Sequence, residues 1–285
     1  MSKKLIITGA AGMLGHDLKR EFGGDHEIVP HDLTLGHDIC DLEATRAMVR
    51  ETQPAAIING VAITNVDGCE SDPDTAYKVN GVGARNVAIA AAECDVPLVH
   101  VSTDFVFSGD KGQPYIEYDP TGPLSVYGES KLWGELLVRD HCEKFFIVRT
   151  QWLYGAAGKN FVETIVGRAE EGHPLTVVDD QVGCPTSTVE LARAIRAILA
   201  HGGYGIYHAS GRGECSWFDF AKKACELAGV ENLDLSPMPS SQLDRPAERP
   251  ADSRMRNYHM ELSFGDPMLP WDEALAEYMT ARASA

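Results

Sequence analysis

A tyrosine and a lysine lie four residues apart at Tyr127 and Lys131, downstream of the threonine Thr103. On a helix, positions i and i+4 share a face, so the Lys131 ammonium is expected beside the Tyr127 ring. A free tyrosine has a pKa of about 10, and a nearby cation lowers that pKa. The pair therefore predicts a proton donor to a carbonyl oxygen, with the Thr103 hydroxyl on the same oxygen. Taken alone, the spacing also fits an ordinary ion–phenol pair on a helix surface.

A glycine-rich turn near the N-terminus supplies a second element. The apolar run 5–7 leads into Gly9, Gly12 and Gly15, and a helical pattern follows through residues 18–22. Gly9 permits a tight turn, Gly12 lets the backbone approach a pyrophosphate, and Gly15 lets the helix pack close to the strand. The free amides and positive dipole end of the helix attract phosphate. The sequence thus predicts a dinucleotide site, although the spacing is G-x-x-G-x-x-G.

Together these residues resemble the extended short-chain dehydrogenase/reductase family over nearly the whole chain. Other segments narrow the resemblance to members that reduce a ketone on a nucleotide-linked sugar; they are 59–67 with Glu70, 102–107, 123–131, 149–155, 180–186 and 249–254. The resemblance implies reduction of the C4 ketone of a dTDP-linked 4-dehydro-6-deoxyhexose, dTDP-4-dehydro-L-rhamnose to dTDP-L-rhamnose, with NADH or NADPH. Related dehydratases carry a glutamate after the aspartate that corresponds to Asp104. Phe105 stands there in this chain, which favours the simple reduction.

The resemblance also implies roles for individual side chains. Thr103, Tyr127 and Lys131 would be catalytic. The cofactor would contact Gly9, Gly12, Met13, Leu14, Gly15, Asp32, Asp38, Ile39, Ala62, Thr64, Tyr127 and Lys131. The substrate would contact Thr64, Asp67, Asp104, Phe107, Trp152, Asn160, Gln181 and Arg249, with Arg249 on the diphosphate. Solvated-loop and core-packing interpretations stay open for Arg249 and Trp152, respectively.

The choice between NADH and NADPH depends on the end of the second expected strand. Asp32 follows the run 28–30 and is placed to accept a hydrogen bond from the adenine ribose 2′-hydroxyl. A carboxylate there repels a 2′-phosphate, and no lysine or arginine follows until Arg46. NADH is therefore favoured over NADPH, and both remain possible.

Composition limits the other partners. The 285 residues carry a formal net charge of −17, which disfavours nucleic acid and anionic membranes. No apolar run is long enough to span a bilayer and no leader is evident, so a cytoplasmic protein is expected. The seven cysteines and ten histidines show no metal-binding spacing, so no catalytic metal is expected. The resemblance leaves a Mg²⁺ ion between subunits possible but poorly supported, through Asp17 and Glu190, and the chain is expected to be a monomer or homodimer.

Strand and helix patterns alternate along the chain, which predicts an α/β fold with a doubly wound parallel sheet, Rossmann-like. The expected strands are 5–7, 27–30, 56–59, 98–102, 145–149 and 205–208. The expected helices include 42–52, 74–94, 131–141, 189–201 and 272–281, while 236–250 is expected as an extended loop. The resemblance implies two interleaved domains: a dinucleotide-binding domain of 1–149, 183–212 and 244–255, and a smaller α/β substrate-binding domain of 150–182, 213–243 and 256–285.

Two other functions remain open. The regulatory β subunit of methionine adenosyltransferase looks similar and binds a dinucleotide without clear reductase activity. A reductase of another nucleotide-linked ketosugar would need the same three catalytic residues. Activity of the purified chain, with a defined sugar, separates these possibilities.

Overall fold

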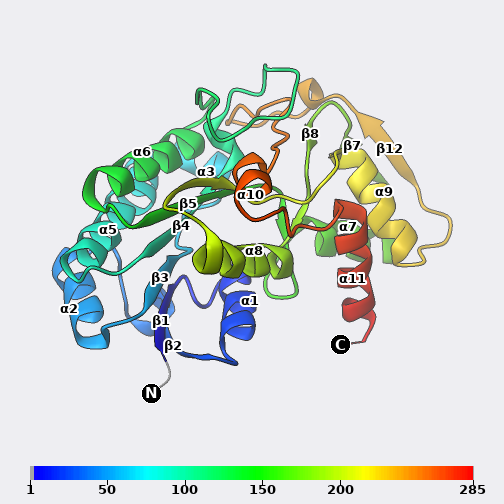
Figure 1. Ribbon diagram of the computed structural model, residues 1–285. Helices are drawn as coiled ribbons and strands as arrows, with labels where there is room; N and C mark the ends of the chain where they lie inside the picture. The colour runs from blue at the N-terminus through cyan, green and yellow to red at the C-terminus, as the bar shows by residue number, and fades with distance from the viewer. Residues whose placement is uncertain (1–2, 285) are drawn as a thin grey trace.

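The computed structural model describes residues 3–284, which contain a six-stranded parallel sheet with helices on both faces (Figure 1). The strand order is β2-β1-β3-β4-β5-β10. The bounds are β1 Lys3–Thr8, β2 His26–His31, β3 Ala56–Asn59, β4 Leu98–Thr103, β5 Phe145–Thr150 and β10 Gly205–His208. The predicted doubly wound sheet and all six of its predicted strands are confirmed.

Helices cover both faces because the strands are apolar on both sides. Successive side chains of a strand point to opposite faces. Leu5 and Ile7 of β1 therefore share one core with α1 (Met13–Phe22) and α8 (Thr188–His201). Ile6 belongs to the opposite core, which is covered by α2 (Leu42–Thr52), α5 (Ala84–Glu93) and α6 (Val126–His141).

A smaller group of elements lies beside the large sheet, on the right of Figure 1. It contains the parallel pair β7 (Leu175–Val178) and β12 (Leu235–Met238), with α7 (Phe161–Glu170), α9 (Trp217–Leu227) and α11 (Trp271–Ala283). Tyr154, Phe220 and Leu275 are fully buried in the core between these helices. The short strands β6 (Leu153–Tyr154), β8 (Val182–Gly183), β9 (Thr186–Ser187) and β11 (Cys215–Ser216) connect the two parts, and α10 (Tyr258–Ser263) packs on β10.

The strand order reverses between β1 and β3, because the chain passes from β1 to β2 on one side and then crosses to β3 on the other. Ligands of such sheets lie beyond the carboxyl ends of the strands at this point. Thr8 ends β1 and Asn59 ends β3, and the Thr8 hydroxyl donates to Asn59 Oδ1 at 2.6 Å. The expected ligand crevice therefore lies beside the glycine-rich turn that follows β1.

The predicted helix over 74–94 is interrupted. It consists of α4 (Pro73–Ala76), a π-helical segment Tyr77–Gly83 and α5. The wider turn accommodates Asn80, whose amide donates to Ser130 Oγ at 2.9 Å and whose carbonyl accepts from the Ile63 backbone at 2.8 Å. Single π-helical turns of this kind are frequent at functional sites. Periodicity alone could not predict it, because the contacts come from distant parts of the chain.

Two other boundaries differ from the sequence predictions. Helix α6 begins at Val126, because Ser125 caps it by accepting from the Gly128 backbone, so Tyr127 and Lys131 are both helical. The segment expected as a loop over 236–250 begins inside β12, where Pro237 is tolerated because the two-stranded pair leaves an open edge. Within residues 3–284, no helix has the length and apolar character needed to cross a membrane.

Candidate active site

A cavity of about 560 Å³ opens beyond the carboxyl ends of β1, β3, β4 and β5. It brings together side chains and backbone from segments more than a hundred residues apart. Of the residues predicted from sequence, the following line it: Gly9, Gly12, Met13, Leu14, Gly15, Ala62, Thr64, Thr103, Asp104, Tyr127, Lys131, Trp152 and Arg249. The predicted phosphate turn and the predicted catalytic residues thus share one cavity.

The glycine turn is built as a backbone cradle. Gly9 has φ +72°, a conformation that favours glycine. A Cβ at Gly15 would lie 2.4 Å from the Gly9 carbonyl oxygen, so no larger residue fits between strand and helix. Helix α1 begins at Met13 with its free amides beside this turn. These residues fit a dinucleotide pyrophosphate.

Tyr127 and Lys131 lie one turn apart on α6, and both are buried. Burial raises the pKa of Tyr127, and the nearby Asp104 carboxylate and Cys69 raise it further. Burial also lowers the pKa of Lys131 to about 8, and its ammonium donates to the Val101 carbonyl at 2.7 Å. The expectation that the Tyr127 pKa lies below its ordinary value is therefore not met, because burial raises it. The phenol is protonated at neutral pH, and its raised pKa makes it a weaker acid than a free tyrosine.

Thr103 ends β4 and lies against the Asp104 side chain. Its hydroxyl donates to Asp104 Oδ1 at 3.0 Å and accepts from the Phe105 backbone at 3.2 Å. Asp104 is only 2% exposed, and burial raises the pKa of its carboxyl to about 6. Phe105 packs edge-on against Tyr127, with ring centroids 5.3 Å apart, and gives this side of the cavity an apolar wall.

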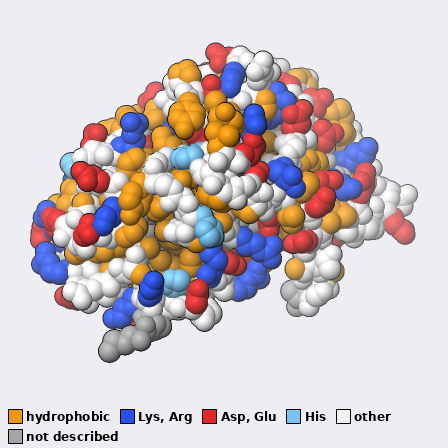
Figure 2. Space-filling view, in the orientation of Figure 1, with side chains coloured by type: hydrophobic (Ala, Val, Ile, Leu, Met, Phe, Trp, Pro, Cys, Tyr) orange, Lys and Arg blue, Asp and Glu red, His pale blue; other side chains and the backbone are white. Residues whose placement is uncertain are grey.

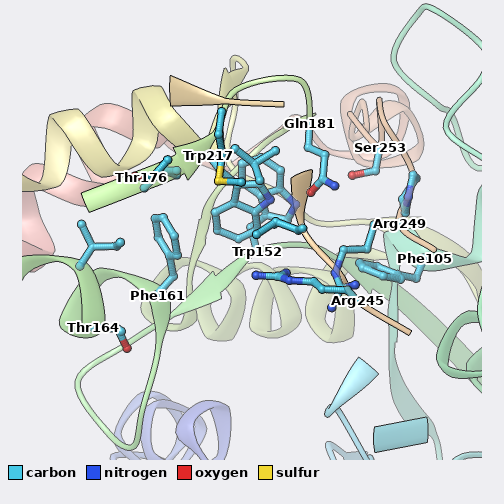
Figure 3. A pocket seen from close by; sticks show the side chains of 16 residues that line it. Phe105, Trp152, Phe161, Thr164, Thr176, Gln181, Trp217, Arg245, Arg249 and Ser253 are labelled. Atoms are coloured by element: carbon cyan, nitrogen blue, oxygen red, sulfur yellow. The ribbon is translucent and has the colours of Figure 1, made fainter. Parts of the chain in front are cut away.

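A second cavity of about 380 Å³ adjoins the first and shares Phe105, Trp152, Trp217 and Arg249 with it. Trp152 stacks on Trp217 with centroids 3.7 Å apart and an interplanar angle of 13°. Trp152 has φ +47°, a rare conformation for a bulky residue, and such strain is typical of functional sites. The ring centroids of Phe161 and Trp217 are 4.6 Å apart. Gln181 also lines this cavity and lies above the stacked rings in Figure 3.

Two arginines lie side by side in the second cavity, Arg245 and Arg249, and Arg249 also lines the first cavity (Figure 3). Arg249 pairs with Asp67 at 2.8 Å, which ties this segment to α3 (Val66–Ser71). Burial, followed by repulsion from Arg249, lowers the pKa of Arg245. Adjacent guanidinium groups of this kind suit a diphosphate, which each can bind with two hydrogen bonds.

Several predicted contacts are not brought to either cavity. Phe107 is fully buried and stacks on Tyr115, with the Arg149 guanidinium over its ring. Asn160 caps α7 and donates to the Gly155 carbonyl. Asp67 holds Arg249, and its own side chain lines neither cavity. These side chains have structural partners, which the sequence does not show.

The residues predicted to contact the adenine side of the cofactor, Asp32, Asp38 and Ile39, also lie outside the two cavities. Asp32 Oδ2 accepts from the Ala11 backbone at 3.2 Å, so it lies against the glycine turn. Asp38 accepts from the Cys40 backbone, and Ile39 is buried in the core beneath α5. Asp32 is therefore the one of these three with a direct contact to the phosphate turn.

Some lining residues were missed by the sequence interpretation: Lys159 in the first cavity, Phe161 and Arg245 in the second, and Trp217 in both. A signal for Arg245 exists, because the dipeptide Arg-Pro occurs twice, at 245–246 and 249–250. The aromatic residues gave no local signal, since their stacking depends on tertiary contacts.

No cluster of three or more potential metal ligands occurs among residues 3–284. The two carboxylates considered for Mg²⁺ have protein partners. Asp17 accepts from the Thr188 hydroxyl at 2.5 Å, and Glu190 pairs with Arg193 at 2.6 Å.

Comparison with known proteins agrees with this geometry. Residues 3–284 match the family described as RmlD substrate binding domain. The chain is 38% identical to a dTDP-4-dehydrorhamnose reductase of Sinorhizobium fredii over 95% of both chains. It is 37% identical to a dTDP-4-keto-6-deoxy-D-glucose reductase of Streptomyces niveus, over 97% of this chain and 96% of that one. The crystal structure of a Bacillus anthracis dTDP-4-dehydrorhamnose reductase in complex with NADP is 38% identical, with a TM-score of 0.95 over 99% of this chain and 100% of that one.

Proposed function

Because the chain belongs to the RmlD substrate-binding domain family, we propose that it reduces the C4 ketone of a dTDP-linked 4-dehydro-6-deoxyhexose, with dTDP-4-dehydro-L-rhamnose as the substrate. One observation carries this conclusion. The glycine cradle and the buried Tyr127, Lys131 and Thr103 side chains line one cavity. A carbonyl reductase needs a dinucleotide and a proton donor at one carbon, and this cavity supplies places for both.

The chain's own residues supply the proton chemistry. A bound dihydronicotinamide supplies the hydride that reaches C4. Tyr127 gives its phenolic proton to the ketone oxygen as negative charge develops there. The raised pKa of Tyr127 makes this transfer harder, so the phenolate that forms needs a cation beside it. The Lys131 ammonium, protonated below about pH 8, stabilises the phenolate that remains and holds the cofactor ribose. Thr103 contributes a hydroxyl at the same oxygen.

We assign the second cavity to the nucleotide of the substrate. Its stacked tryptophans offer an apolar face to a base, and Arg245 and Arg249 lie where the diphosphate would join base and sugar. Acidic and basic side chains are interspersed over the face in Figure 2. Because the chain as a whole is acidic, an anionic substrate needs local positive charge, which Arg245 and Arg249 supply in the second cavity. Most of the lining comes from 150–182 and 213–243, which we propose as parts of the substrate-binding domain.

Removal of the arginines tests this assignment. Arg245→Ala and Arg249→Ala are each expected to raise the KM for the dTDP-sugar roughly 10- to 100-fold with little change in kcat, since each removes about 1.5–3 kcal/mol of charge-assisted bonding. Arg256→Ala serves as a control, because Arg256 is exposed and pairs with Glu261 away from the cavities. Asp67→Asn breaks the ion pair between Asp67 and Arg249 but keeps the Arg249 guanidinium, so it shows how much of the change in KM comes from the ion pair alone. Unchanged KM in both arginine variants would place the diphosphate elsewhere.

For the cofactor, we propose that NADH is used at least as well as NADPH. Asp32 lies against the glycine turn, and its carboxylate repels a 2′-phosphate. Arg46, the first basic residue after it, is held by Glu43 and Glu93. The ratio of kcat/KM for the two cofactors checks this preference, and Asp32→Ala is expected to shift the ratio toward NADPH.

The function is tested by mixing purified protein with dTDP-4-dehydro-L-rhamnose and following the oxidation of NADH and NADPH. Rapid oxidation supports the reductase. Dinucleotide binding without oxidation would favour the regulatory-subunit alternative, and oxidation only with another 4-ketosugar would change the substrate. We propose that the chain acts as a monomer or a homodimer.

A further inference from the structure

The Thr103 hydroxyl has one proton to donate, and the structure shows where that proton goes. A hydroxyl carries one donor and two acceptor positions. In Thr103 the proton is donated to Asp104 Oδ1 at 3.0 Å, and one acceptor position receives the Phe105 backbone N–H at 3.2 Å. What remains is an acceptor position. In this arrangement Thr103 cannot donate a hydrogen bond to a substrate ketone.

Asp104 is placed to control this direction. It is 2% exposed, and its second oxygen, Oδ2, is buried without a hydrogen-bond partner among the described residues. The charged form of a buried carboxylate is destabilised when only one of its two oxygens accepts a hydrogen bond. Protonated on Oδ1, the same group would become a donor to Thr103 Oγ1, and the threonine proton would be released.

We propose that Asp104 is a positioning residue whose proton decides the direction of the Thr103 hydroxyl: toward Asp104 when the carboxyl is ionised, and toward the substrate ketone when it is protonated. The proposal rests on the ketone reduction proposed above. In this role the buried Asp104 carboxyl acts through Thr103 and does not need to contact the substrate.

The surroundings of Asp104 allow it to take up a proton in the accessible pH range. Its pKa is raised to about 6, chiefly by burial, and the hydrogen bond from Thr103 limits the rise. The titratable groups coupled to it are Tyr127 on α6 and Cys184 after β8. Burial raises the pKa of both, so both are neutral near pH 6 and Asp104 titrates against a constant background.

The kinetic test compares Asp104→Asn with wild-type enzyme in single-turnover cofactor oxidation between pH 5 and 8. The asparagine amide can donate to Thr103 Oγ1 at every pH and so imitates the protonated acid. As the pH rises through about 6, the wild-type rate is expected to fall, whereas the rate of the variant should not change there. The ratio of variant to wild-type rates should therefore increase by up to about 100-fold, the usual effect of one hydrogen-bond donor at a developing oxyanion. Thr103→Val should be slow and should also lack the step. Asp110→Asn, at an exposed position near Ser108, should keep the wild-type profile.

A second measurement does not depend on turnover. In the free protein labelled with ¹³C at aspartate carboxyls, the Asp104 resonance, identified by its loss in Asp104→Asn, should titrate near pH 6. Thr103→Val removes a hydrogen bond to the ionised form and should raise that pKa further. An Asp104 that titrates at an ordinary pKa, or that ignores Thr103→Val, overturns the proposal. So does a wild-type pH step that persists in Asp104→Asn, whereas absence of turnover in the wild type contradicts the reductase function itself.

Discussion

A Tyr127→Phe variant is expected to lose turnover by roughly 10²- to 10⁴-fold, the usual contribution of a general acid. The variant lacks only the phenolic hydroxyl. Its ring keeps the edge-on contact with Phe105, and the glycine cradle is untouched. Dinucleotide binding should therefore stay near the wild-type value, as measured by fluorescence titration or calorimetry. Full activity in the variant would show that another group protonates the ketone.

The pH dependence of the wild-type rate provides a companion result. Burial lowers the pKa of Lys131 to about 8, so the ammonium is present below that pH and is lost as the pH rises through it. Turnover is expected to decline through about pH 8 for this reason. The Tyr127 phenol, whose pKa is raised, does not titrate in this range. In Asp104→Asn, the decline near pH 8 should remain, since it belongs to Lys131.

Sequence periodicity predicted the large sheet because central strands such as β1 and β3 are continuous apolar runs, buried on both faces. The smaller part was predicted only in outline. Its strands β8 and β11 are two residues long, too short for any periodic signal. Helices α7 and α9 are held by aromatic packing among Phe161, Trp217 and Phe220, which depends on tertiary contacts.

The same distinction applies to the site. Tyr127 and Lys131 could be predicted because their relation is local, four residues on one helix. The structural roles of Phe107 and Asn160 could not be predicted. Phenylalanine occurs both in buried cores and in pocket walls, and asparagine occurs both at helix caps and in binding sites, so residue type does not distinguish these roles. The pKa of Tyr127 was misjudged for a related reason: sequence spacing reveals a neighbouring cation but not the extent of burial.

Arg149→Met is expected to destabilise the protein by about 3–5 kcal/mol, the typical result of breaking a buried ion pair. Arg149 on β5 binds Glu135 of α6 through two bonds of 2.9 and 2.7 Å, and the Ser102 hydroxyl donates to the same carboxylate. All three are buried, so removal of the arginine leaves a carboxylate with no countercharge in its direct contact. Denaturant unfolding measures the loss. Arg256→Met breaks an exposed pair and should cost about 0–1 kcal/mol.

Replacing both partners separates the structural role of this pair from its electrostatic role. The double variant Glu135→Leu with Arg149→Met leaves no unpaired charge, so most of the lost stability should return. The charge of Glu135 also raises the pKa of Lys131, one helical turn away, against the effect of burial. Without Glu135, Lys131 should lose its proton at a lower pH, and the alkaline decline in turnover should move below about pH 8. A double variant with restored stability and an unshifted decline would show that the ion pair supports the fold without tuning the lysine.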